Sequence, residues 1–321
     1  MIKTLLGLSL KGGDKCRLSI IDYHRITPEK DQYVDSVTQA ELDWQCSILK
    51  EFFNVLPLEQ AVDLLQKGQL PTRSAVITFD DGYANNCALA LPVLEKWDLP
   101  ATFFIASGFL DGGIMWNDAI IEAFRRTDYE SLEISAPDSF PEDLIGFYDL
   151  STQKKRVETA NKFRLAVKYL DLSRREDVVA ALVEIAGVKL PKDIMLTSEQ
   201  VKEIYVSGMA IGGHTQSHPI LTTISVEKAK QQIMDDKEKL QQIIGADINH
   251  FAYPNGIPRK DFLPVHTDIL QELGYKAAVT TKSGVSSPQT DLYQLPRFSP
   301  WDKTTFRYLY RMFMNGLGVY G

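Results

Sequence analysis

Short apolar runs that stop abruptly at glycine, aspartate or histidine recur along the chain, and stretches with helical periodicity separate them. The clearest runs lie at residues 17–23, 75–79, 101–106 and 209–211. A strand that is apolar at nearly every position is buried on both faces, as in a parallel sheet. The alternation of such strands with helices predicts an α/β fold.

Capping signals and helical periodicity predict the helices between these strands. Thr38 and Glu41 form a capping box ahead of an apolar face. Residues 58–68 have apolar positions at helical spacing and stop at a glycine. Further helices are expected at 87–97, at 197–206 with Thr197 or Ser198 as N-cap, and from Ser225 to Ile244, where Gly245 ends the helix.

The pattern changes between Asp111 and about Lys192, where helical periodicity dominates. Helices are expected over 118–126, 153–170 and 174–186, and their polar residues carry both signs. We interpret this segment as an inserted helical subdomain on the face of the sheet where functional loops lie. Two roles are open for it. It is either a solvated hairpin with a structural role only or a lid that shapes a substrate site.

Composition fits one large soluble domain. The chain has 321 residues, of which 44% are hydrophobic and 24% charged, and barrel folds reach this length as one unit. Its net charge of −7 argues against nucleic acid as a partner, because phosphate binding requires clustered lysine and arginine. Cys16, Cys46 and Cys87 are odd in number and lack metal-like spacing, which argues against a disulfide framework.

Both ends of the chain carry information about the cellular compartment of the protein. The apolar run within residues 1–10 is short, the polar stretch from Lys11 to Lys15 ends it, and no A-x-A site is present, so we expect no cleaved signal peptide. No other apolar run approaches the roughly 20 residues of a membrane span. A cytoplasmic protein is therefore expected. The aromatic and basic tail at 305–320 fits either a membrane surface or a helix packed on the domain.

Two adjacent carboxylates follow the run at 75–79. Asp80 and Asp81 come directly after Phe79, and Gly82 permits a tight turn. Neighbouring carboxylates repel each other unless a cation neutralises one of them or one is kept for proton transfer. The alternative is a surface turn in which Asp-Gly only ends a strand.

A pair of histidines follows the run at 209–211. If a helical turn starts at His214, the spacing of four to His218 places both imidazoles on one face, as two ligands of one metal ion require. The chain holds five histidines, so a pair at this spacing favours a metal site over two surface histidines. One aspartate and two histidines make an open three-ligand site, which is typical of catalytic rather than structural zinc.

Three motifs occur in a recognisable order: TFDDGY at 78–83, HTQSH at 214–218 and FAYPNG at 251–256. They resemble the motifs of the polysaccharide deacetylase (NodB-like) family, carbohydrate esterase family four, and the flanks LPATFFIA and GYKAAVT extend the resemblance over most of the chain. The resemblance implies a distorted (β/α)7-type barrel with Asp80 as general base. It also implies that Asp81, His214 and His218 bind one divalent ion. Such ligands favour zinc, with cobalt, nickel or manganese as substitutes.

The first apolar run ends in DYHRIT. This start resembles the circularly permuted bacterial exopolysaccharide and poly-N-acetylglucosamine deacetylases, in which the catalytic histidine comes from the first strand. Other members of the family carry that histidine in a carboxy-terminal Leu-x-His motif, which this sequence lacks. The resemblance therefore implies that His24 is the general acid. The alternative is a strand-end histidine bonded to backbone.

The chain departs from the family pattern at the third motif. Ala252 replaces an arginine that would keep the base ionised, and Asn255 replaces a tyrosine. Arg297 follows a strand-like run at 292–295 and is expected to pair with Asp80 in its place, with a surface arginine as the alternative. A backbone N–H near Asn255 is expected to hold the oxyanion. Residues 115–117, Met-Trp-Asn, resemble a stretch near the cleft of related enzymes, in keeping with a lid.

The expected activity is removal of N-acetyl groups from amino sugars of a polysaccharide or a lipid-linked oligosaccharide. Residues 1–321 then form a single deacetylase domain with a helical insertion at about 111–192. The alternatives are a small-molecule metal amidohydrolase on the same scaffold and a non-catalytic carbohydrate-binding relative. The expected partner is a carbohydrate, and the long insertion and tail favour a larger or lipid-linked one.

Overall fold

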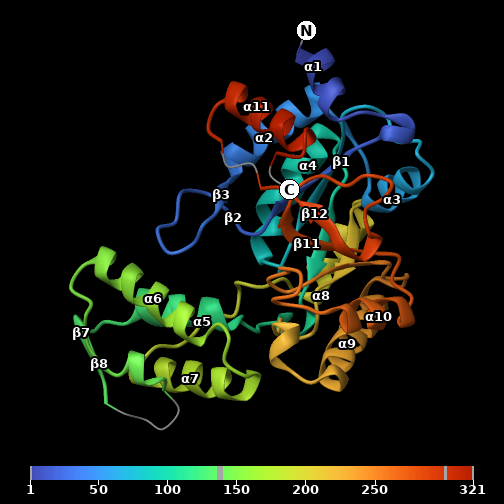
Figure 1. The fold of residues 1–321 in the computed structure, drawn as a ribbon. Helices are drawn as coiled ribbons and strands as arrows, with labels where there is room; N and C mark the ends of the chain where they lie inside the picture. The colour runs from blue at the N-terminus through green and yellow to red at the C-terminus, as the bar shows by residue number, and fades with distance from the viewer. Residues whose placement is uncertain (1, 136–139, 300–301, 320–321) are drawn as a thin grey trace.

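Seven parallel strands form a nearly closed barrel in the larger of two lobes, and the helical insertion forms the other (Figure 1). The computed structural model describes residues 2–135, 140–299 and 302–319. This architecture confirms the α/β class and the distorted barrel expected from the sequence. In sheet order the strands are β1 (Leu18–Tyr23), β5 (Ser74–Phe79), β6 (Thr102–Ile105), β9 (Ala210–Gly213), β10 (His250–Ala252), β11 (Ala277–Ser283) and β12 (Leu295–Arg297), with β4 (Asn54–Val55) paired to β5.

Hydrogen bonds between the first and last strands bring the barrel close to closure. Phe298, just after β12, donates its N–H to Ile20 (2.8 Å) and accepts from the N–H of Asp22 (3.4 Å). All six residues of β5 are buried, as its continuous apolar run predicts. Because parallel strands end at the same edge of a sheet, the polar residues that follow them meet there.

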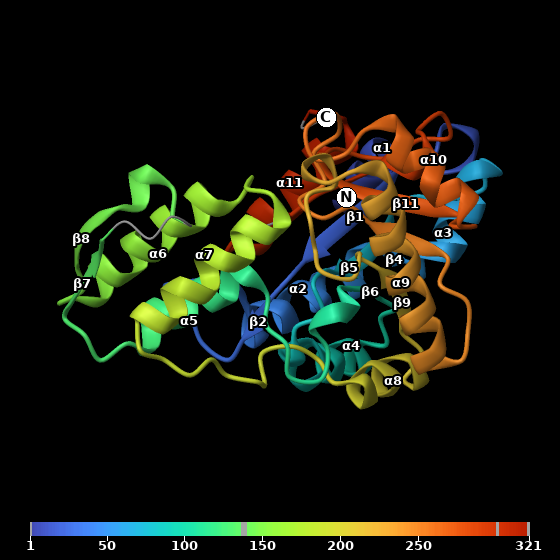
Figure 2. The ribbon, with the colours of Figure 1, turned by 90° about the horizontal axis from the view of Figure 1, so that it is seen from below.

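Helices cover the outside of the barrel (Figures 1 and 2). The capping box of Thr38 and Glu41 opens α2, Thr197 caps α8, and Ser225 caps α9. Gly245 ends α9 with a left-handed φ of 70°. The outer helices are α2 (Gln39–Phe52), α3 (Leu58–Gln66), α4 (Leu91–Trp97), α8 (Ser198–Val206), α9 (Val226–Ile244) and α10 (Pro264–Glu272).

Two expected elements differ in detail. The helix predicted at 87–97 is divided into a π-helical segment (Asn86–Ala90) and α4, because Pro92 has no N–H with which to continue the regular ladder. The strand predicted at 292–295 begins only at Leu295. Asp291 accepts a hydrogen bond from the N–H of Tyr293 (2.9 Å) and turns residues Leu292–Gln294 into a 3₁₀ helix. The other short elements are β2 (Ile26–Thr27), β3 (Val37–Thr38) and 3₁₀ helices at Gly13–Lys15, Ser107–Phe109, Glu142–Leu144 and Leu221–Thr223.

The segment at 111–192 lies beside the barrel with a hydrophobic core of its own (Figure 2). Its helices are α5 (Trp116–Arg126), α6 (Gln153–Val167) and α7 (Leu172–Ile185). The expectation of helices alone was incomplete, because β7 (Ser131–Ile134) and β8 (Gly146–Asp149) form an antiparallel hairpin. β7 alternates exposed and buried residues, which is the strand period, but four residues are too few for it to stand out.

The two ends of the chain pack together as α1 (Ile2–Ser9) and α11 (Thr305–Gly316) (Figure 1). Gly316 allows this close approach, since a Cβ there would lie 2.7 Å from the Ser9 hydroxyl. Tyr308 and Met312 of α11 are fully buried in the main hydrophobic core, so one face of the tail helix packs on the domain, whereas Phe306 and Tyr310 on another face stay exposed. Tyr320, the last residue of the predicted tail, lies outside the described residues. Within the described ranges, no helix combines the length and apolar character needed to cross a bilayer.

Candidate active site

The two adjacent carboxylates lie where β5 ends and the chain turns. Asp80 donates its N–H to the carbonyl of Tyr23 (2.9 Å), which keeps it in the register of the sheet. Asp81 and Gly82 then both adopt left-handed conformations, with φ of 77° and 85°. Glycine is required at the second position, because a Cβ on Gly82 would lie 3.0 Å from the Ile105 side chain. The turn directs the neighbouring carboxylates to different partners.

Asp80 is held by Arg297, at the end of β12. Its two carboxylate oxygens accept hydrogen bonds from Nη1 (2.7 Å) and Nη2 (2.5 Å), and both side chains are at most 2% exposed. Arg297 also donates from Nε to the carbonyl of Thr280 (2.9 Å). Burial raises the pKa of the Asp80 carboxyl, but the charge and hydrogen bonds of Arg297 outweigh it and hold that pKa below its usual value. The pairing predicted from the sequence is therefore present, and it favours the ionised carboxylate.

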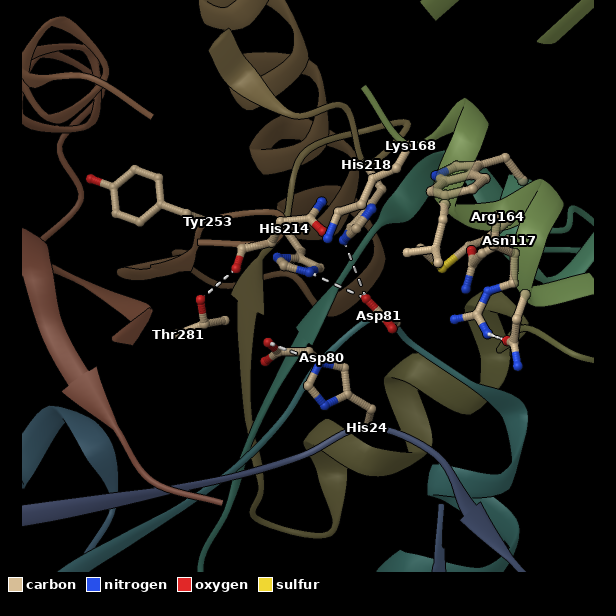
Figure 3. Close-up of a pocket in the computed structure, with 15 residues that line it drawn as sticks. His24, Asp80, Asp81, Asn117, Arg164, Lys168, His214, His218, Tyr253 and Thr281 are labelled. Atoms are coloured by element: carbon tan, nitrogen blue, oxygen red, sulfur yellow. Dashed lines mark hydrogen bonds and ion pairs between the residues drawn. The ribbon is translucent and has the colours of Figure 1, made fainter. Parts of the chain in front are cut away.

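The two histidines converge on Asp81 from the loop after β9 (Figure 3). Asp81 Oδ1 lies 3.3 Å from Nε2 of His214 and 3.4 Å from Nε2 of His218. The helical turn expected at His214 is wrong, because Thr215 and His218 have φ of 65° and 51°, which a right-handed helix does not contain. A tight loop brings the imidazoles together instead.

Buried polar groups orient His214. The backbone N–H of His214 donates to Oδ2 of Asp236 (2.8 Å), and the ring Nδ1 lies 2.7 Å from the carbonyl of Ala252. With Nδ1 protonated toward that carbonyl, the lone pair of Nε2 is left for a cation held between His214, Asp81 and His218. Asp236 also accepts from the N–H of Ser107 (2.9 Å), so it ties two loops of the site together. Sequence reasoning missed Asp236, which is one of many charged residues along α9.

Asp81, His214 and His218 fit a divalent cation. Ligand atoms of a tetrahedral site with bonds of about 2.1 Å lie about 3.4 Å apart, and the separations from Asp81 to the two histidines are 3.3 and 3.4 Å. Burial and the neighbouring His214 lower the pKa of His218 to about 3. Burial raises the pKa of Asp81, but the adjacent imidazoles of His214 and His218 outweigh it and lower that pKa strongly. An ionised carboxylate and a neutral imidazole are the forms that bind a metal.

A cavity of about 580 Å³ opens beside these groups. His24 follows β1 and lines the cavity, with Nε2 3.9 Å from Oδ2 of Asp80 and 44% of its side chain exposed. Asn255 also lines it, with a left-handed φ of 58°, and its carbonyl accepts a hydrogen bond from the Thr281 hydroxyl (2.5 Å). All the site residues expected from the sequence line this cavity except Arg297. Arg297 lies behind Asp80 and binds the carboxylate of that lining residue.

The insertion supplies a further wall of the same cavity (Figure 3). Residues 115–117 line it, as the resemblance implied, and this favours a lid over a purely structural hairpin. Four lining residues of α6 and the turn after it were missed by the sequence analysis, because helical periodicity does not indicate which face of a helix meets a distant loop. They are Asn161, Arg164, Leu165 and Lys168.

Comparison with known proteins agrees with the geometry. The family model of polysaccharide deacetylases matches residues 67–131 and 164–278. YxkH of Bacillus subtilis, whose name carries the same family term, is 20% identical over 289 residues, which cover 90% of this chain and 73% of that protein. The poly-beta-1,6-N-acetyl-D-glucosamine N-deacetylase of Staphylococcus aureus is 36% identical over 74 residues, which cover 23% of this chain and 26% of that protein.

A solved structure shares the fold. The Streptococcus pyogenes deacetylase PplD in complex with acetate superposes with a TM-score of 0.61 at 19% identity, and the match covers 93% of this chain and 99% of that one. The matched stretches of the family model include Asp80, Asp81, His214 and His218 and omit 132–163, the middle of the insertion. These stretches make up more than half of the chain, which therefore belongs to the polysaccharide deacetylase family.

Proposed function

We propose that this protein is a metal-dependent hydrolase that removes N-acetyl groups from amino sugars of a glycan. The observation that carries the proposal is the set of three metal-binding side chains beside a buried, ionised carboxylate, Asp80, in one cavity. Amide hydrolysis requires polarisation of the carbonyl, a base for the attacking water and an acid for the leaving amine. This edge of the barrel offers a candidate for each task.

Each group in the site is assigned one role in the reaction. Asp81, His214 and His218 would hold the ion, which when bound polarises the acetyl carbonyl and lowers the pKa of water. Asp80 takes the proton from the attacking water, since its pairing with Arg297 favours the ionised form. The backbone N–H near Asn255 stabilises the oxyanion that develops on the acetyl group, and His24 protonates the leaving amine.

Zinc is the ion that we infer for this site. One carboxylate and two imidazoles with a further position open are the ligand set of catalytic zinc centres. Cobalt, nickel and manganese accept similar ligands and are the substitutes to test. Elemental analysis of the purified protein, followed by activity after chelation and reloading with each ion, identifies the one that supports turnover.

A glycan is the favoured substrate class. The Staphylococcus aureus relative is named for a poly-N-acetylglucosamine, and the partly exposed His24 leaves this cavity open to solvent. A non-catalytic relative is disfavoured, because the three metal-binding side chains and Asp80 are all present. Acetate release from chito-oligosaccharides, poly-beta-1,6-N-acetylglucosamine and a lipid-linked N-acetyl sugar, each with and without chelator, tests the proposal. Activity on small amides alone would favour the amidohydrolase.

His24→Ala is expected to lower turnover on an N-acetyl sugar by roughly 10²-fold and to leave metal content unchanged. An amine leaves poorly without a proton, whereas the phenolate of 4-nitrophenyl acetate departs unaided. The same variant should therefore keep most of its esterase activity. Steady-state release of acetate and of nitrophenol measures the two reactions. Equal losses on amide and ester would mean that His24 only positions or packs the site.

His266→Gln is the matched control for this experiment. His266 lies in α10, and the structure does not place it among the residues that line the catalytic cavity. Its Nδ1 accepts a hydrogen bond from the N–H of Leu263 (3.0 Å), a role that glutamine can fill at the third position of a helix. The variant should retain both activities.

An anionic bilayer surface is the second partner that we propose, through α1 and α11. These helices carry three basic residues and no acidic one, although the whole chain has a net charge of −7. Arg311 is paired with Asp302 (2.5 Å), which leaves Lys3 and Arg307 as the cations outside an ion pair among the described residues of the two helices. Leu8 is 60% exposed and Phe306 is 79% exposed. Apolar side chains that project among basic ones suit the interface of an anionic membrane. A groove of about 470 Å³ between the helices is lined by Ile2, Leu5, Leu6, Thr305, Phe306, Leu309, Tyr310 and Phe313.

The double variant Leu8→Ser, Phe306→Ser is expected to lower vesicle binding by about tenfold or more, because burial of a large apolar side chain contributes about 1.5–3 kcal/mol. Flotation with vesicles of phosphatidylglycerol and phosphatidylcholine measures it. Phe147→Ser is the control, since Phe147 is 69% exposed but lies on the insertion. Dimerisation without vesicle binding would contradict the proposal and make a second copy of the chain the occupant.

A further inference from the structure

Two cations of the insertion face the catalytic cavity without an acidic partner. Arg164 in α6 and Lys168 at its carboxyl end are four residues apart, so they share one face of the helix, and both line the cavity (Figure 3). Within the described ranges neither makes an ion pair. Arg164 donates to Oδ1 of Asn161 (3.2 Å), its buried Nε has no hydrogen-bond partner, and Lys168 lies 5.6 Å from the ring centre of Tyr169.

The acids at this cavity are already engaged. Asp80 and Asp81 are the acidic residues among the described ones that line it, and they contact Arg297 and the two metal-binding histidines. With Arg297 counted behind Asp80, three permanent cations stand against two carboxylates around the cavity, in a chain whose net charge is −7. A neutral N-acetyl sugar offers only hydroxyl and amide groups, which require no cation. Partly buried cations attract an anion more strongly than exposed ones do.

We propose that Arg164 and Lys168 form a subsite for an anionic group, a phosphate or a carboxylate, which the glycan carries close to the sugar that is deacetylated. The inference rests on the proposed deacetylase function and narrows its substrate class. A guanidinium binds two oxygens of such a group at once, and an ammonium adds a point charge. Because the reacting groups lie on the barrel, the subsite holds the substrate and takes no part in bond breaking. Its loss should therefore change KM rather than kcat.

Steady-state acetate release from three substrates tests the subsite. They are neutral chitotetraose, a chito-oligosaccharide 1-phosphate and an oligosaccharide that contains N-acetylmuramic acid, so the two anionic arms separate phosphate from carboxylate. Arg164→Gln and Lys168→Gln should each raise KM about tenfold for at least one anionic substrate, with kcat unchanged and chitotetraose unaffected. The control is Lys154→Gln in the same helix, where the side chain is 85% exposed and not among those that line the cavity. Equal effects on charged and neutral substrates, or none, would overturn the proposal.

A binding measurement separates failure of the subsite from failure of the proposed function. Calorimetric titration with glucosamine 6-phosphate and with muramic acid, one probe for phosphate and one for carboxylate, needs no turnover, because neither sugar carries an acetyl group. Tenfold weaker binding to Arg164→Gln than to the wild type supports the subsite even if no glycan is deacetylated. Unchanged binding of both sugars overturns the subsite even if chitotetraose releases acetate and the deacetylase function stands.

Discussion

Asp80→Asn keeps its metal but loses about 10²- to 10⁴-fold in kcat for acetate release, the usual contribution of a general base. Asparagine has nearly the shape of aspartate, but it cannot accept the proton of the attacking water. The neighbouring Asp81, which lies 3.3 Å from His214, is left intact by this change. Metal analysis and steady-state kinetics on the same preparation measure the two effects.

Two controls accompany this variant. Asp81→Asn should weaken metal binding as well as turnover, and equal loss of metal in both variants would contradict the division of labour between the two acids. Removing one partner of a buried ion pair costs about 3–5 kcal/mol of stability, because the other charge stays buried. Thermal unfolding must therefore be compared too. In the double variant Asp80→Asn, Arg297→Gln the guanidinium charge that Asp80→Asn leaves unpaired is also removed. If turnover is still lost, the loss comes from the missing base and not from the buried charge.

His214→Ala is expected to lose both metal and activity, down to the level of the chelated wild-type protein. The wild type should hold about one equivalent of ion, bound through the lone pair that Nε2 of His214 presents beside Asp81. Alanine removes that ligand and leaves two. Elemental analysis and acetate release measure the result.

His250→Ala is the control for this variant. His250 begins β10, whereas Ala252, which contacts His214, ends that strand. The control should keep its metal and its activity. Full metal content in His214→Ala would show that His214 is not a ligand, and the site would then have to be assigned again.

The local sequence pattern correctly predicted which residues follow the buried strand at the catalytic end of the barrel. Asp80, Asp81 and Gly82 were placed at the end of a buried strand because apolar periodicity stops there, and the structure has them after β5. The convergence of the two histidines was predicted for the wrong reason. A spacing of four suggested a helical turn, but the left-handed residues at Thr215 and His218 produce the contact by a different path, which residue identities alone do not indicate.

Contacts between distant segments were the part that sequence could not supply. Arg164 lies in a polar helical stretch with charges of both signs, and no local property distinguishes the cation that faces the cavity from those that face solvent. α1 packs on α11 although the two helices lie at opposite ends of the sequence. The residue pattern of either helix alone could not predict this contact. Contacts between distant segments depend on the path of the whole backbone. Here that path includes the insertion, and the family model does not match its middle.

The left-handed residues at the site set a limit on how far this protein can be stabilised by engineering. Asp81, His218 and Asn255 all have positive φ, a conformation that costs most non-glycine residues about 1 kcal/mol or more, and aspartate and asparagine less than the others. Glycine at these positions would relieve that strain and raise the melting temperature, but it would delete a side chain of the cavity each time. The barrel thus retains an instability at its catalytic edge, and a search for more heat-resistant variants should leave these three positions fixed.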